Sequence, residues 1–360
     1  MFSIARSLVR YPFYASVCKK QNSLQRCTAL LHTSQAIRES AIPPLKSKQV
    51  MSLPINPLIL QKIPALKGIP FSKLDVKKLD GWSNHNYRIT LPNGFSQVLR
   101  IPKVGLEEQI DRQVETQNNQ KMAQMGICPS FSYVDSESGI VMRSYVEGEV
   151  PCDEEGRVHS EAPQRIGTLL RKIHSCPPFF VNTVDNLAMM EHYLQGIQKS
   201  SKLPTFYEEM PKMVHRVKNA INYSSFTLVP CHNDPNPRNF VFNKDNVMLL
   251  DWEYAGNGDP AWDVAYFITH GNLNREEEST FLSAYHQRIS SSHFSRRMAI
   301  YKPMTELILS LWIRLQIVKG YYPISAQDFE DYELMGVETA RTMFSSPDFM
   351  ESLLCLEASR

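Results

Sequence analysis

The spacing of hydrophobic and polar residues changes character along the chain. Between residues 71 and 145, short apolar runs alternate with polar residues and are separated by turn-forming residues, which is typical of β-strands. Strands are expected at 71–79, 86–91, 97–101, 130–134 and 140–145. A polar segment over residues 107–125, ending at Gly126, predicts one inserted helix. Together these elements predict a small α+β lobe.

The pattern becomes helical after a hinge expected at residues 144–148. Apolar residues at helical spacing predict a helix over residues 162–174, and more helices are expected over 185–222 and 260–357. One β-rich stretch, residues 226–251, interrupts them. The chain is therefore predicted to be an α+β protein with a β-rich N-terminal lobe and a mainly helical C-terminal lobe.

Two segments of different composition precede the strands. Residues 1–38 contain six Lys or Arg, five Ser and no Asp or Glu, which is typical of a mitochondrial transit peptide. The alternative is a basic tail without targeting information, in which case the protein would be cytoplasmic. The predicted organisation is a leader (1–45), a linker (46–70), an N-terminal lobe (71–147) and a C-terminal lobe (148–360).

Composition excludes several classes of protein. A formal net charge of +2 without a long basic run gives no support for a nucleic-acid binder. No run approaches the roughly 18 apolar residues of a membrane-spanning helix, so no transmembrane segment is expected. The seven cysteines are odd in number and form no C-x-x-C pair, which indicates reduced thiols without a zinc site.

The candidate chemistry lies in the β-rich stretch. His232, Asp234 and Asn239 have the spacing of a phosphotransfer catalytic loop, and Asp251 follows after a hairpin as a metal-binding aspartate would. Asp234 is expected to accept the proton of an acceptor hydroxyl, because phosphoryl transfer needs positioning more than a strong base. Asn239 and Asp251 offer the oxygen ligands that Mg²⁺ prefers, and His232 is expected to be structural.

Two neighbouring strings of residues extend the motif. Residues 250–256 read Leu-Asp-Trp-Glu-Tyr-Ala-Gly, and residues 258–265 read Gly-Asp-Pro-Ala-Trp-Asp-Val-Ala. They resemble the choline/ethanolamine-kinase-like branch of the aminoglycoside phosphotransferase superfamily, and the resemblance extends over about residues 75–320. It implies a protein-kinase-like two-lobe fold that uses ATP and Mg²⁺ to phosphorylate a small molecule.

The resemblance also implies roles for residues outside the catalytic loop. Ser83 and Asn84 lie in a stretch similar to the family's phosphate-covering turn, although the family turn is richer in Gly. Arg100 matches the basic residue that binds phosphates, and Glu115 is its expected ion-pair partner. Asp263 matches an aspartate that holds the catalytic loop from beneath.

The acceptor is less narrowly defined. Tyr254 and Trp312 match aromatic residues that surround a quaternary ammonium in choline kinases, where cation–π attraction is favourable. Leu309 replaces a second tryptophan, and His270 stands where the family has an acid. The implied partner is a small hydroxyl compound such as choline or ethanolamine. The alternatives are a thiamine or aminoglycoside/sugar-type kinase and a catalytically silent kinase-like binding protein, with a homodimer left open.

Overall fold

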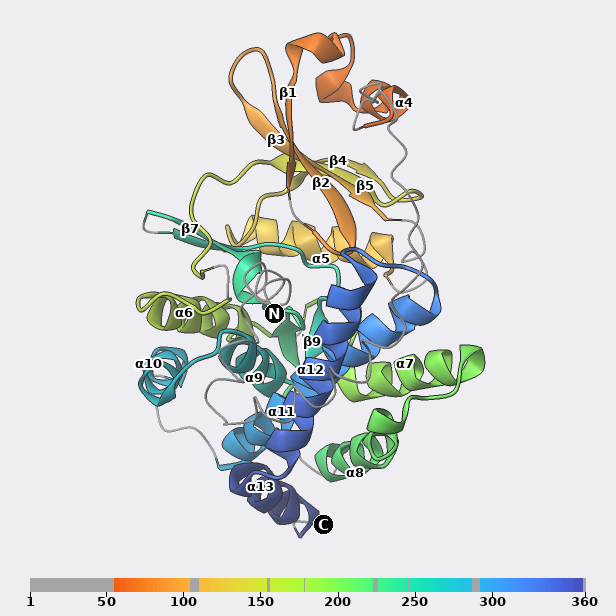
Figure 1. Cartoon of the computed structure of the whole chain (residues 1–360). Coiled ribbons are helices and arrows are strands. Elements are labelled where there is room, and N and C mark those ends of the chain that lie inside the picture. Colours follow the sequence, from red (N-terminus) through yellow and green to blue (C-terminus); the bar gives the residue numbers. More distant parts are fainter. Residues whose placement is uncertain are drawn as a thin grey trace, which may run out of the picture.

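The computed structural model describes residues 55–79, 81–103, 110–153, 156–177, 179–222, 226–244, 246–286 and 292–358. The leader predicted over residues 1–45 lies outside this part of the chain. A β-sheet lobe stands above a larger helical lobe, and the second lobe contains the C-terminus (Figure 1). The predicted two-lobe α+β fold is confirmed.

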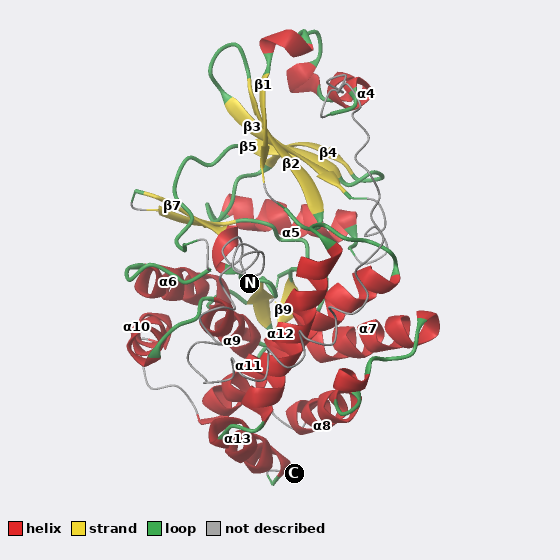
Figure 2. Cartoon of the chain, viewed as in Figure 1, coloured by secondary structure: helices red, strands yellow, loops and turns green. Residues whose placement is uncertain are grey.

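The N-terminal lobe is built on one antiparallel sheet. Its strands are β1 (Asp75–Leu79), β2 (Asn84–Thr90), β3 (Ser96–Pro102), β4 (Phe131–Asp135) and β5 (Ile140–Ser144). Their order across the sheet is β1-β2-β3-β5-β4, with every neighbouring pair antiparallel. Helix α5 (Arg112–Gln124) lies between this sheet and the helical lobe (Figure 2). This position brings polar side chains of α5 to the junction of the lobes.

The residues before the sheet cover its apolar face. The segment predicted as a linker contains helix α4 (Pro57–Lys62) and the 3-10 helix η2 (Pro64–Leu66), which bury apolar side chains against the sheet residues Tyr87 and Leu99. A sheet with one apolar face must bury that face against another element, which explains the packing. The strand predicted over residues 71–79 begins instead as the 3-10 helix η3 (Phe71–Lys73) before β1.

The second lobe is mainly helical. Its helices are α6 (Ala162–His174), α7 (Asn186–Ser200), α8 (Met210–Asn222), α9 (Pro260–His270), α10 (Arg275–His286), α11 (Ser292–Val318), α12 (Ala326–Phe344) and α13 (Pro347–Glu357). Helix α6 has the predicted bounds, because its apolar residues follow a helical period and are buried. No helix in the described part of the chain is both long and apolar enough to cross a membrane.

Two short β pairs carry the candidate chemistry on top of this lobe. Strand β6 (Val229–Cys231) pairs with β9 (Gly256–Gly258), and β7 (Phe240–Asn243) pairs with β8 (Asn246–Leu249) as a hairpin. The sequence did not predict β9, because a Gly-Asn-Gly run lacks the residues that favour strands. Its pairing with β6 places the segment after Asp251 beside the segment before His232.

Candidate active site

The catalytic loop and the hairpin bring the four predicted residues together. The side-chain amide of Asn239 donates to the carbonyl of Asp234 at 3.0 Å, and it lies 3.4 Å from that residue's carboxylate. The N–H of Leu250 donates to the carbonyl of Asn239 at 2.8 Å, so the chain returns beside the loop immediately before Asp251. Asp251 itself has a φ of 66°, a left-handed conformation that Asp tolerates better than most residues. Such strained backbone is common at functional sites.

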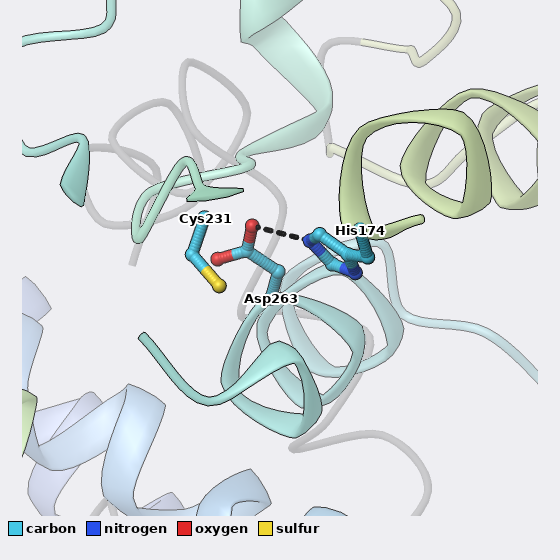
Figure 3. Close-up of side chains that lie close together, drawn as sticks. All are labelled: His174, Cys231 and Asp263. Atoms are coloured by element: carbon cyan, nitrogen blue, oxygen red, sulfur yellow. Dashed lines mark hydrogen bonds and ion pairs between the residues drawn. The ribbon is translucent and has the colours of Figure 1, made fainter. Parts of the chain in front are cut away.

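Asp263 of α9 anchors this loop from beneath. Its fully buried carboxylate accepts the backbone N–H groups of His232 and Asn233 at 2.7 and 2.8 Å. His174 of α6 donates from Nε2 to the same carboxylate at 3.1 Å, as Figure 3 shows. These contacts give Asp263 the structural position that the resemblance implied, because the loop backbone is held by a buried charge.

The cluster of His174, Cys231 and Asp263 has the composition of a metal site. The three ligand atoms lie within 4.8 Å of one another (Figure 3). However, the carboxylate of Asp263 already accepts three N–H groups, and Nδ1 of His174 faces the Tyr285 hydroxyl at 2.8 Å. Burial raises the pKa of the Cys231 thiol well above its usual range, so the thiol stays protonated. We therefore interpret the cluster as structural.

His232 joins the catalytic loop to the strand that leads to Asp251. The N–H of Asp234 donates to Nδ1 of His232 at 3.3 Å, so the imidazole proton lies on Nε2 and is donated to the carbonyl of Leu250 at 2.9 Å. Burial lowers the pKa of His232, which keeps the ring neutral. These two hydrogen bonds fix the shape of the loop.

The environment of Asp234 suits a proton acceptor near neutral pH. Burial raises the pKa of its carboxyl to about 7, and the negative charges of Asp251 and Glu253 act in the same direction. Hydrogen bonds from the Tyr266 hydroxyl and the Asn239 amide oppose the rise, because they stabilise the carboxylate. An acid with a pKa near the working pH can both take up and release a proton.

Two buried arginines meet the catalytic residues from the N-terminal lobe. Arg100 of β3 lies 2.6 Å from Glu115 of α5 and 3.2 Å from Asp251, and these carboxylates keep the guanidinium charged. Arg112 lies 2.9 Å from Glu115 and 3.2 Å from Glu253. In the described structure Nε and Nη2 of Arg100 and Nη2 of Arg112 are buried without a hydrogen-bond partner. Such N–H groups are suitable donors for phosphate oxygens.

The predicted phosphate-covering turn contacts Glu253. Ser83 donates from its hydroxyl to Glu253 at 3.1 Å, and Asn84 donates from its side-chain amide to the same carboxylate at 3.3 Å. Burial raises the pKa of Glu253 to about 7, and the charge of Asp251 adds to the rise. A hydroxyl, an amide and a guanidinium around one carboxylate form a donor set that a phosphate group could also use.

The aromatic residues predicted for the acceptor lie on the C-terminal lobe side. A side-chain hydrogen bond joins Tyr193 and Tyr254. The backbone carbonyl of Tyr254 accepts from the side-chain amide of Asn233, the residue before Asp234, at 3.0 Å. Trp312 of α11 is buried and stacks against Trp82. His270 is buried with its pKa lowered to about 4 by desolvation, so the ring is neutral at the position where the resemblance implied an acid.

The oxygen atoms present fit Mg²⁺, and the unpartnered donors fit a nucleotide's phosphates. Carboxylate oxygens of Glu115, Asp251 and Glu253 lie within 4.8 Å of one another, and Asn239 ends the catalytic loop, where its carbonyl accepts from the N–H of Leu250. A hard cation prefers such ligands, and magnesium in kinases shares them with phosphates. Of these, Asn239 and Asp251 are the residues that would hold Mg²⁺.

The sequence analysis did not predict Arg112, Glu253 and Tyr266 as site residues, nor His174 beneath the loop. Arg112 precedes Glu115 by three residues on one helical face, so its spacing offered a signal. Glu253 lies after the end of β8, where no regular period predicts the direction of a side chain. Tyr266 carries no such signal, because a tyrosine on an apolar helix is indistinguishable from a core residue.

The fold and the site together define a class of protein. A sheet lobe with a buried Arg–Glu pair, joined to a helical lobe with this loop and hairpin, is the architecture of kinase-like phosphotransferases. The chain belongs to the phosphotransferase enzyme family, whose family model matches residues 75–299. The predicted resemblance to its choline/ethanolamine-kinase-like branch is confirmed by the relatives that follow.

Both curated proteins and solved structures resemble the chain. Protein LicA of Haemophilus influenzae is 25% identical over 280 residues, which cover 76% of this chain and 79% of that protein. The crystal structure of a choline/ethanolamine kinase family protein from Mesorhizobium loti has a TM-score of 0.71 and 26% identity, covering 84% of this chain and 97% of the other. Choline kinase LicA from Streptococcus pneumoniae has a TM-score of 0.66 and 24% identity, covering 79% and 98%.

Proposed function

We propose that this protein transfers the γ-phosphate of ATP, bound with Mg²⁺, to the hydroxyl of choline, ethanolamine or a similar amino alcohol. One observation carries the proposal. Asp234, Asn239 and Asp251 lie together beside buried guanidinium groups of Arg100 and Arg112 that retain unpartnered N–H donors in the described structure. A proton acceptor, oxygen ligands for a hard cation and fixed positive charges are the parts that phosphoryl transfer requires.

The roles of the residues follow from these contacts. Arg100 and Arg112 bind phosphate oxygens through their spare N–H groups, and Glu115 holds both guanidiniums in place. Asn239 and Asp251 are the residues that would hold Mg²⁺, and the ion would supply positive charge to the phosphates. Asp234 orients the acceptor hydroxyl and takes its proton. The hydroxyl oxygen forms a bond to the γ-phosphorus while the bond to the bridging β–γ oxygen breaks, and ADP leaves.

The aromatic residues support an organic cation as acceptor. Trp312 and Trp82 lie with their ring planes within 13° of parallel, and the carbonyl of Tyr254 accepts a hydrogen bond from Asn233, the residue before Asp234. Each aromatic face adds about 0.5–2 kcal/mol of cation–π attraction at a desolvated site. The neutral ring of His270 supplies no charge, so recognition would depend on aromatic faces more than in relatives with an acid there. The names of the Streptococcus pneumoniae and Mesorhizobium loti relatives point to the same acceptors.

Thiamine is the second candidate acceptor. Thiamine kinase of Escherichia coli O157:H7 is 27% identical over 121 residues, 34% of this chain and 40% of that protein. Thiamine is also a cation with a free hydroxyl, and its planar rings are suited to stacking on an indole face such as that of Trp312. Measuring turnover of thiamine and of the amino alcohols side by side distinguishes the two acceptors.

The test is an ADP-release assay with ATP and Mg²⁺ over choline, ethanolamine, thiamine and an aminoglycoside. We expect turnover of an amino alcohol and a loss of at least about a hundredfold in Asp234→Asn. Asp348→Asn, an exposed acid on α13, is the matched control and should retain full activity. Turnover of thiamine alone would refute the amino-alcohol assignment. Nucleotide binding without turnover of any acceptor would favour a silent binding protein.

Mitochondrial import is a separate proposal that rests on the composition of residues 1–45 alone. A fluorescent protein fused to these residues should enter mitochondria. A fusion that stays in the cytosol would refute the proposal.

A further inference from the structure

The turn between β1 and β2 sends one side chain across to the helical lobe. The indole of Trp82 stacks on Trp312 of α11, with ring centroids 6.5 Å apart. It also meets Phe329 and Tyr332 of α12 edge-on, at 5.8 and 5.4 Å. A turn residue of the N-terminal lobe therefore completes an aromatic cluster whose other members, Trp312, Phe329 and Tyr332, belong to the C-terminal lobe.

Hydrogen bonds from both lobes hold the backbone of the same turn. The carbonyl of Trp82 accepts a hydrogen bond from the hydroxyl of Tyr321, in the loop between α11 and α12, at 2.5 Å. Lys103 donates from Nζ to the carbonyls of Gly81 and Trp82, both at 2.8 Å. The indole therefore has little freedom to leave the cluster while these contacts hold.

The opposite side of the turn carries the predicted phosphate donors. Ser83 and Asn84, the next residues, hold the carboxylate of Glu253 beside Arg112. Because Ser83 and Asn84 directly follow Trp82, phosphate oxygens bound by these two residues would restrain the same short turn that carries the indole. The residues expected to bind phosphate, Ser83 and Asn84, and the indole of Trp82 therefore belong to one short segment of backbone.

Polar atoms beside the cluster indicate that a ligand completes it. Trp312 is buried, with 8% of the residue exposed, and its Nε1 has no hydrogen-bond partner in the described structure. Gln316, one helical turn later, is fully buried with both amide atoms unpartnered there. Buried polar atoms normally have partners, so their concentration here points to a polar ligand or its water.

We propose that Trp82 couples the nucleotide site to the acceptor site: nucleotide bound by the β1–β2 turn fixes this indole as one wall of the acceptor pocket. Trp82 is then a specificity-determining residue for the acceptor. The placement of the acceptor at Trp312 and of the nucleotide at the β1–β2 turn rests on the proposed function, whereas the contacts that join this turn to the helical lobe do not. Coupling is reciprocal, so nucleotide and acceptor should each tighten the other's binding by the same factor.

The first experiment needs no acceptor. Hydrogen–deuterium exchange of the full chain with and without ADP and Mg²⁺ should show slower exchange in the β1–β2 turn and also at residues 319–335. In Trp82→Leu the slowing should remain in the turn and disappear from residues 319–335. Tyr321→Phe, which removes one hydroxyl and keeps the ring, should give an intermediate result. Phe95→Leu, which changes an exposed ring in the β2–β3 turn, should behave as wild type.

The second experiment uses an acceptor that the assay identifies. In Trp82→Leu we expect nucleotide affinity without acceptor to change less than about threefold and the acceptor KM to rise at least about tenfold. The factor by which each ligand increases the affinity for the other should fall to about one. Wild-type coupling in Trp82→Leu, or an equal loss of nucleotide and acceptor affinity, would overturn the proposal. If no amino alcohol reacts but exchange at residues 319–335 still depends on Trp82, the proposed function fails and the coupling stands.

Discussion

Removing the hydroxyl of Tyr266 should change the pH dependence of catalysis rather than its maximum. This hydroxyl donates to the carboxylate of Asp234, whose pKa is raised to about 7. A donated hydrogen bond stabilises the ionised carboxylate, so Tyr266→Phe should raise the pKa further. Asp234 must be ionised to accept the proton, and activity at neutral pH should therefore fall.

The size of the effect follows from the strength of one hydrogen bond. A hydrogen bond to a charged group contributes about 1.5–3 kcal/mol. At about 1.36 kcal/mol per pKa unit, its loss moves the pKa of Asp234 up by roughly one to two units. At pH 7 about half of the wild-type carboxyl groups are ionised, against roughly 1–9% in the variant. We therefore expect kcat/KM to fall roughly five- to fiftyfold at pH 7 and no more than about twofold at pH 9.

The assay is kcat/KM for the acceptor from pH 5.5 to 9.5, because this parameter reports ionisations of the free enzyme. The nucleotide's own titration is common to both enzymes and cancels in the ratio of their profiles. Tyr301→Phe is the matched control, since it removes a buried hydroxyl that bonds to Asp259 instead. If kcat/KM of Tyr266→Phe is lower than that of wild type by the same factor at every pH, the reasoning is refuted.

Two further substitutions test buried carboxyl groups. Burial raises the pKa of Glu306 on α11 to about 8 from 4.5, so the folded state keeps a proton that the unfolded state loses, and stability falls as the pH rises through this range. Glu306→Gln should therefore gain about 3 kcal/mol of unfolding free energy relative to wild type between pH 5.5 and pH 8, measured by urea unfolding. Glu115→Gln leaves the guanidiniums of Arg100 and Arg112 without their shared buried carboxylate. Breaking a buried pair costs about 3–5 kcal/mol, so we expect a loss of stability and at least about tenfold weaker ADP binding, measured by calorimetric titration.

Each of these two predictions has a control. For Glu306→Gln the control is Glu330→Gln, which changes an exposed acid on α12. Its unfolding free energy should differ from that of wild type by the same amount at pH 5.5 and at pH 8. A pH-independent difference for Glu306→Gln itself would mean that Glu306 is ionised in the folded protein. Glu137→Gln changes an exposed acid in the β4–β5 turn and should leave ADP affinity unchanged. Unchanged affinity in Glu115→Gln would show that Arg100 and Arg112 do not need Glu115 to bind phosphate.

Local patterns determined much of the architecture from the sequence. The amphipathic period of residues 162–174 specified a helix with the observed bounds, because burial of one helical face depends only on spacing within that helix. The catalytic loop was equally local, since His232, Asp234 and Asn239 lie within eight consecutive residues and Asp251 follows one hairpin later. Residues that share a short loop lie close together in space because few residues of chain separate them.

Other features depended on contacts between distant segments. Ser83 and Glu253, which form a hydrogen bond, are 170 residues apart in the chain. Trp82 reaches Trp312 from the other lobe, and Tyr266 reaches Asp234 from the far side of the loop. Neither spacing nor residue type specifies which distant side chains will face each other.

The sequence by itself thus determined the reaction class, because the chemistry lies in one short loop and hairpin with a distinctive spacing. It also identified His270 as a departure from the family. Only the tertiary structure decided that this ring is buried and neutral, that Glu253 contacts Ser83 and Asn84 of the other lobe, and that Trp82 stacks on Trp312. These outcomes depend on burial and on the packing of two lobes, which are properties of the whole fold.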